Sequence, residues 1–160
     1  MRKAEREIKD IVGIRSVLDT ADVCRLGIYS KGEVYIVPMS FGFELTDDGI
    51  LTLFFHCANE GRKLDMIAEN PEVCFELDVV RKLIPPATDY ACDSSVSFSS
   101  VIGNGHIEIL TVNQDRIDAL TMLMKKYSDL DNFHFNEKAL AATTVLKLTA
   151  SSYTGKQSKA

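Results

Sequence analysis

Two short turns in the first third of this chain constrain its fold more than any other feature. A turn at 31–33 follows a strand-like run at 23–29. It leads into a second run at 34–43, and another turn at 46–49 connects that run to a third at 50–56. Connections this short can join only antiparallel strands, because a parallel crossover needs roughly a dozen residues or more. These three strands therefore do not belong to the parallel sheet of an α/β fold.

Three later strand-like runs and four helical patterns complete the predicted fold. The strands are expected at 73–80, 98–110 and 144–153, and the helices at 5–20, 61–69, 114–127 and 137–142. Asn113 and Asn136 are expected to cap two of these helices, because an Asn side chain accepts a hydrogen bond from a first-turn amide. Pro38 indicates an edge, a bulge or a kink in the second strand. Six antiparallel strands with flanking helices predict a mainly β (α+β) fold, a small closed or split β-barrel.

Length and composition limit the class of protein. With 160 residues and no internal repeat or linker, the chain is expected to form one domain over residues 1–160. A net charge of -5 argues against nucleic acid as the main partner, because phosphate backbones bind basic surfaces. No apolar run approaches the ~20 residues of a membrane span, and the charged N-terminus does not resemble a signal peptide. The 4 cysteines form no Cys-x-x-Cys pair, so we expect free thiols in a reducing cytoplasm and no disulfide.

The segment 54–71 carries the strongest functional signal. A strand-like run ends in the small polar cluster 56–59, Gly61 breaks the strand, and a helix begins with Arg62 and Lys63. The free amides of a helix start and two cationic side chains can hold a phosphate. Basic residues in the first turn oppose the helix macrodipole, so an anionic ligand would explain their position. The alternative is a solvated surface pair, but the glycine and the small cluster before it favour the ligand.

Histidines and cysteines offer weaker candidates. His56 could be a base, a metal ligand or a hydrogen-bonding wall of a pocket, and beside a phosphate loop a ligand contact is at least as plausible as a structural role. Cys57 could have a lowered pKa next to Arg62 and Lys63, or could be a small apolar filler. His106 and Glu108 share a strand face, but no further acidic or histidine cluster accompanies them, so a solvated face is the better interpretation. We therefore predict no metal site and assign no catalytic residue.

Two features of the later half also suggest a binding role. Residues 84–97 form the longest irregular stretch, and loops of that length are often functional. Gly103 and Gly105 lie on one face of a strand, where they either let a backbone or a flat ligand approach closely or mark a bend in the barrel.

The sequence lacks the motifs of several large enzyme classes. It has no Gly-x-Gly-x-x-Gly after a first strand, no Walker lysine motif and no Ser-His-Asp order. Any chemistry must therefore be carried by a cofactor. FMN fits, because its phosphate suits the loop at 58–63 and its flat ring suits the strand around Pro38.

The same segments resemble a known family. His56-Cys57-Ala58 followed by Gly61-Arg62-Lys63 and Asn70-Pro71 is similar to the FMN-binding split-barrel family related to pyridoxamine-phosphate oxidase, in particular its nitroimidazole-resistance branch. The segments 34–42 and 99–105 match two further strands of that family, and the resemblance runs from about residue 2 to Lys156. It implies a six-stranded antiparallel split β-barrel with flanking helices.

The resemblance also implies a site. Family members are homodimers in which two FMN molecules lie between the protomers. By position, the ring is expected to rest against Val37, Pro38, Met39 and Ser40. The phosphate is expected to be held by Arg62 and Lys63, and the ribityl chain to lie along His56, Cys57 and Ala58. The far wall of the pocket is expected to be formed by Ser99, Ser100 and Val101.

The implied activity is the reduction of small organic acceptors such as nitroaromatic compounds, by hydride from reduced flavin and with NADH or NADPH as electron donor. The chain ends without the arginine- and proline-bearing tail with which the oxidases recognise pyridoxal phosphate, which disfavours a pyridoxamine-phosphate-oxidase-like reaction. Other hypotheses are a flavin- or haem-binding module without turnover, and a barrel that binds no flavin.

Overall fold

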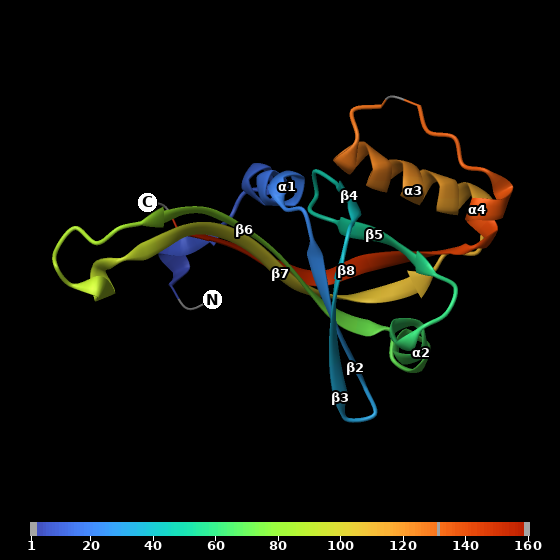
Figure 1. The fold of residues 1–160 in the computed structure, drawn as a ribbon, viewed down its shortest axis with the longest axis horizontal. Coiled ribbons are helices and arrows are strands. Elements are labelled where there is room, and N and C mark those ends of the chain that lie inside the picture. The colour runs from blue at the N-terminus through green and yellow to red at the C-terminus, as the bar shows by residue number, and fades with distance from the viewer. Residues whose placement is uncertain (1–2, 131, 159–160) are drawn as a thin grey trace.

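The fold is built on one antiparallel sheet that curls around a hydrophobic core, with helices packed around it (Figure 1). The computed structural model describes residues 3–130 and 132–158. The strands are β1 (Glu7–Ile8), β2 (Cys24–Ser30), β3 (Glu33–Met39), β4 (Gly42–Leu45), β5 (Leu51–Ala58), β6 (Glu72–Ile84), β7 (Ser95–Ile109) and β8 (Thr143–Ser158). The helices are α1 (Ile11–Thr20), α2 (Arg62–Glu69), α3 (Asn113–Tyr127) and α4 (Glu137–Ala141), with 3-10 turns η1 (Ala4–Arg6) and η2 (Ala91–Asp93).

The strand order is β3-β2-β6-β7-β8-β5-β4, with β1 paired to the far end of β8. All pairs are antiparallel, which confirms the predicted mainly β fold with flanking helices. Within the described residues β3 and β4 are not paired to each other, so the barrel stays split. None of the described helices has the length and apolarity needed to cross a membrane.

The prediction of six strands was wrong, because the run at 34–43 is two strands. The chain leaves the sheet at Ser40 and Phe41, and β4 then pairs with β5 at the opposite edge. Pro38 lies in the edge strand β3, where its missing N–H leaves no pairing partner unsatisfied. Phe41 is fully buried, so the crossing from one edge to the other is anchored in the core.

The N-terminal helix is shorter than the predicted 5–20. Helix α1 begins after Asp10, whose carboxylate accepts a hydrogen bond from the Gly13 amide at 2.7 Å. The residues before it form η1 and the short strand β1, the other strand that the six-strand prediction missed. Residues 1 and 2, where the family resemblance begins, lie outside the described residues.

The two predicted asparagine caps had different outcomes. The Asn136 side chain accepts from the Ala139 amide at 2.7 Å, which confirms it as the cap of α4. Asn113 was wrong as a cap, because α3 already includes it and Val112 occupies the cap position without a side-chain hydrogen bond.

The glycines of β7 make room for the protein's own core. A Cβ at Gly103 would lie 2.5 Å from Cζ of Phe75 and 2.5 Å from the Ser152 carbonyl oxygen. The register between β7 and β8 also shifts between Asn104 and Gly105, where the strand bends. The close approach expected at these glycines is therefore made by an aromatic core residue and a neighbouring backbone.

The irregular stretch predicted at 84–97 is confirmed for residues 85–94, which lie outside the strands. Strand β6 continues to Ile84 and β7 begins at Ser95, so only the tip of a long hairpin, with η2 in it, lies outside strands. The strand pattern of this ribbon was hidden by the prolines and serines around the tip.

Candidate functional site

The start of α2 has the features of an anion site. Gly61 occupies the cap position with φ 135°, a conformation open to glycine, and offers no side-chain cap to the first-turn amides. No atom lies within 4 Å of a Cβ built on Gly61, so the space in front of the helix start is open. The loop is fixed from behind by Asn59, which donates to the Ala141 carbonyl at 2.7 Å and accepts from the Thr144 hydroxyl at 2.9 Å.

Arg62 connects this helix start to the edge strand β3. Its guanidinium donates to the Glu33 carboxylate at 2.8 Å and lies 4.9 Å from the centre of the Tyr35 ring. Sequence reasoning missed Glu33 and Tyr35, because nothing in their spacing indicates a partner in α2. The structure therefore brings the predicted phosphate loop against the N-terminal half of the predicted ring strand.

The side chains of β3 alternate between the core and solvent. Val37 is half-buried and packs against the core, and Met39 is buried, whereas Pro38 and Ser40 are exposed. A ligand on the outer side of β3 would thus meet Pro38 and Ser40 directly, and Met39 only through its backbone.

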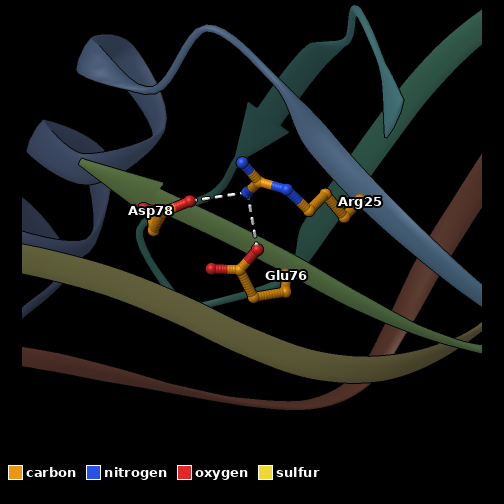
Figure 2. Close-up of polar contacts among 3 residues, drawn as sticks. All are labelled: Arg25, Glu76 and Asp78. Atoms are coloured by element: carbon orange, nitrogen blue, oxygen red, sulfur yellow. Dashed lines mark hydrogen bonds and ion pairs between the residues drawn. The ribbon is translucent and has the colours of Figure 1, made fainter. Parts of the chain in front are cut away.

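The neighbouring strands continue this outer face with a group of charges. Arg25 of β2 is paired in register with Pro38 of β3 and with Glu76 of β6. Figure 2 shows its guanidinium between two carboxylates of β6, 2.9 Å from Glu76 and 2.5 Å from Asp78. These carboxylates raise the pKa of Arg25 by hydrogen bonding, so the guanidinium stays charged.

The segment 99–101 lies apart from β3 within one chain. Ser99 and Val101 are buried, and only Ser100, opposite Asp78, is partly open on the outer face. Because β2 and β6 lie between β3 and β7 in the sheet, the two segments are separated by three strand spacings, about 14 Å along the sheet. One chain therefore assembles the phosphate loop with β3 but does not bring 99–101 to them.

The predicted ribityl segment forms the end of β5. His56 and Ala58 are exposed and Cys57 is half-buried. Burial raises the pKa of the Cys57 thiol, and the charge of Lys63 lowers it by less. Because the net direction is upward, the structure favours the protonated filler over the reactive thiolate. All four cysteines are free thiols.

The outer side of β7 carries a histidine and a glutamate that both contact neighbouring side chains at the surface. His106 Nδ1 lies 2.7 Å from the Glu72 carboxylate, and Glu108 pairs with Lys147 at 3.2 Å. Within residues 3–130 and 132–158, no group of three or more His, Cys, Asp or Glu side chains could hold a metal ion.

Two residues of α3 that sequence reasoning missed hold the link between β3 and β4. The Tyr127 hydroxyl accepts from the Phe41 amide at 3.0 Å and donates to the Asp22 carbonyl at 2.8 Å. Lys126 donates to the Leu18 and Asp19 carbonyls, and its ammonium lies 4.6 Å from the centre of the Phe41 ring. Burial raises the pKa of Tyr127 and lowers that of Lys126. The exposed Ser40 therefore lies beside a backbone amide that α3 fixes in place.

The curled, incompletely closed antiparallel sheet is that of a split β-barrel protein. A family model described as pyridoxamine 5'-phosphate oxidase matches residues 13–157, and the chain belongs to this family. The resemblance seen in the sequence is thereby confirmed.

Solved structures agree with this assignment. A proposed 5-nitroimidazole antibiotic resistance protein from Bacteroides thetaiotaomicron is 30% identical, with a TM-score of 0.81 over 94% of this chain and 86% of that one. A flavocytochrome from Azotobacter vinelandii shares the fold at 18% identity, with a TM-score of 0.82 over 100% of this chain and 72% of that one. A FAD and heme binding protein from Mycobacterium smegmatis has 20% identity and a TM-score of 0.78, over 97% and 74% of the two chains. A search of curated proteins found no match.

Proposed function

We propose that this protein binds FMN, with the phosphate at the start of α2 and the ring on the outer side of β3. The observation that carries the proposal is the glycine-capped, open helix start flanked by Arg62 and Lys63. Free amides and two cations at one point suit a dianionic phosphate better than any neutral group. The neighbouring structures described as flavin-binding proteins support a flavin as the group attached to it.

The ring position follows from the direction of β3. Arg62 contacts Tyr35, which shares the core-facing side of β3 with Val37, whereas Pro38 lies on the exposed side three residues further along, about 10 Å away. A cofactor whose phosphate is held by Arg62 would therefore pass around the free edge of β3 to bring its ring to Pro38 and Ser40 on the exposed side. In this position the chain binds and orients the cofactor, with Arg62 exchanging Glu33 for phosphate.

We further propose that two copies of the chain form a homodimer and share each flavin. The segment 99–101 and the Val37–Ser40 segment are about 14 Å apart in one chain, so a second copy is needed to place both on one ring. The proposed activity is the reduction of small organic acceptors such as nitroaromatic compounds, with NADH or NADPH as donor. It is supported by the 30% identity to the proposed nitroimidazole resistance protein. Bound flavin would supply the electron transfer.

The first test is the absorption spectrum of the purified protein, followed by heat release and identification of the chromophore. Oxidised-flavin absorbance and released FMN are expected. A Soret band would favour a haem-binding module, and a colourless protein that ignores added FMN would overturn the flavin proposal. The apoprotein is then titrated with FMN and riboflavin, and equal affinity for the two would overturn the phosphate assignment.

The second test concerns turnover. If the protein is a reductase, NADH or NADPH bleaches the flavin, and a nitroaromatic acceptor restores the colour over many cycles. Stable bleaching without reoxidation by any acceptor, or no bleaching at all, would instead indicate a carrier. Pyridoxamine 5'-phosphate serves as the control substrate and is expected to give no product.

A further inference from the structure

The outer face of the sheet carries an arginine with unused hydrogen-bond donors. Arg25 bonds to both Glu76 and Asp78 through the same nitrogen, Nη1. Figure 2 shows this nitrogen between the two carboxylates and a second guanidinium nitrogen directed away from them. In the part of the chain that the structure describes, the side chain has no further acceptor. Because a guanidinium carries N–H donors on each of its nitrogens, the edge formed by Nε and Nη2 remains available.

This edge is accessible and held in place. The Arg25 side chain is 46% exposed, and those of Glu76 and Asp78 are 31% and 34% exposed. Contacts from two carboxylates to one nitrogen restrict the rotation of the guanidinium, whereas a lone surface arginine samples many rotamers. The edge formed by Nε and Nη2 is therefore preorganised to donate a pair of parallel hydrogen bonds to a ligand.

The free edge lies next to the proposed position of the flavin ring. Arg25 pairs in register with Pro38, and both residues are exposed on the outer face. Side chains paired in this way have Cβ atoms about 5 Å apart. The guanidinium reaches from there across to β6, one strand spacing or about 5 Å further along the sheet. A small molecule that stacks on a ring at Pro38 and extends toward β6 would meet this edge.

The shape of the edge selects a planar group with two oxygen atoms. A pair of parallel N–H donors in one plane matches oxygens that lie side by side, as they do in a carboxylate. A nitro group has the same planar geometry but no net charge. Both groups can accept from Nε and Nη2 of Arg25, so charge must decide between them.

The charges around the edge favour the neutral group. Glu76 and Asp78 together outweigh the single positive charge of Arg25, so the cluster is net negative. Lys156 lies on the same face, but β8 is two strand spacings or about 10 Å from β6, and the Lys156 ammonium lies 6.0 Å from the centre of the Phe98 ring. A ligand carboxylate would be repelled by the carboxylates of β6, whereas a nitro group would not.

We infer that Arg25 is the specificity-determining residue for the electron acceptor, and that Glu76 and Asp78 restrict its free edge to neutral nitro compounds. This inference rests on the proposed function and names the chemical group that the site recognises on the acceptor. Arg25 supplies the hydrogen bonds to the nitro oxygens. The two carboxylates hold the guanidinium in place and exclude anions of the same shape.

The experiment compares nitrobenzene with benzoate, which has the same shape but carries a negative charge. Each ligand is titrated by calorimetry into the flavin-loaded protein in its oxidised state, without an electron donor, so that binding is measured without turnover. The wild type is expected to bind nitrobenzene at least about tenfold more tightly than benzoate.

Neutral variants of the carboxylates should remove this preference. Glu76→Gln with Asp78→Asn keeps the shape of both side chains and leaves Arg25 as the only charge of the cluster. Benzoate should then bind at least about tenfold more tightly than it binds to the wild type, and nitrobenzene about as before. Glu72→Gln with Glu108→Gln is the matched control, because it changes the net charge of the outer face equally but at other ion pairs.

A lysine in place of the arginine tests the paired donors. Arg25→Lys keeps the positive charge but loses the planar fork, so nitrobenzene should bind about tenfold more weakly. FMN affinity, measured by titration of the apoprotein, should stay unchanged. An altered FMN affinity would place the guanidinium on the flavin ring and not on the acceptor, and would overturn the inference.

The flavin content of each preparation separates this inference from the proposed function. A flavin-loaded wild type that binds both ligands equally, or binds neither, would overturn the inference alone. A preference for nitrobenzene that persists after both carboxylates of β6 are neutralised would do the same. A protein that ignores added FMN would overturn the proposed function, and this inference with it.

Discussion

The phosphate side and the ring side of the proposed site are held by different kinds of contact. On the phosphate side, Arg62 and Glu33 form an ion pair in which both side chains are more than half exposed. On the ring side, Phe41 is buried, and its amide bonds to Tyr127, 86 positions away in the sequence. Exposed charges can be removed without disturbing the core, whereas a change on the ring side affects both ligand binding and the stability of the fold. Binding and stability should therefore separate on one side of the site and change together on the other.

The largest effect is expected from removing the charges of the phosphate side. Arg62→Ala with Lys63→Ala should weaken FMN binding by about 3–6 kcal/mol, since each charge-assisted contact contributes about 1.5–3 kcal/mol. The loss should fall near the lower end, because solvent screens these exposed groups. Titration of the apoprotein measures the affinity, and thermal unfolding of the apoprotein should change little. Lys125→Ala, an exposed lysine of α3, is the control, and an unchanged FMN affinity in the double variant would remove the phosphate from this loop.

A bulky charge on the ring side should have the next largest effect. Ser40 is exposed beside the buried Phe41, so Ser40→Arg should disturb the visible flavin spectrum and weaken binding by about 1–3 kcal/mol through overlap with the ring. Circular dichroism should still show a folded domain. Loss of both fold and flavin would mean that position 40 supports the core, and retention of both would place the ring elsewhere.

The contact between α3 and the ring side can be tested by removing the hydroxyl oxygen of Tyr127. Tyr127→Phe removes both the acceptor for the Phe41 amide and the donor to Asp22, and should cost about 1–2 kcal/mol of unfolding free energy. Because the amide is next to Ser40, FMN affinity and the position of the flavin absorbance maximum should also shift.

Tyr153→Phe provides the comparison for this change. The Tyr153 hydroxyl donates to the Gly49 carbonyl at 2.8 Å, outside the proposed site, so its loss should lower stability without moving the flavin spectrum. Equal spectra for the two variants would show that Tyr127 supports the fold only.

The smallest effect is expected at the carboxylate that pairs with Arg62. Glu33→Gln removes a negative charge from the phosphate site and frees the guanidinium, so FMN should bind more tightly by about 0.2–1 kcal/mol. Glu44→Gln, on the exposed side of β4, is the control. Weaker FMN binding in Glu33→Gln would mean that the ion pair positions Arg62 for phosphate and does not compete with it.

Local signals in the sequence predicted the antiparallel start of the sheet and the phosphate loop. The turns at 31–33 and 46–49 restrict the chain to hairpins by their length alone. The helix expected at 61–69 agrees with α2 to within one residue. Its ends are predictable because the glycine before the first turn and Asn70-Pro71 after the last turn have backbone preferences of their own. Asn136 was predicted as a cap for the same reason.

Only the tertiary structure decided how these pieces are completed. The run at 34–43 reads as one strand, but Phe41 enters the core and divides it into β3 and β4 at opposite edges of the sheet. Asn113 has the side chain of a cap, yet the helix starts one residue earlier than this role requires. The hydrogen bond between Tyr127 and Phe41 joins residues 86 positions apart in the sequence, and the one between Arg62 and Glu33 joins residues 29 positions apart. Pattern and propensity describe neighbours in sequence, and such contacts exist only after burial has brought distant strands and helices together.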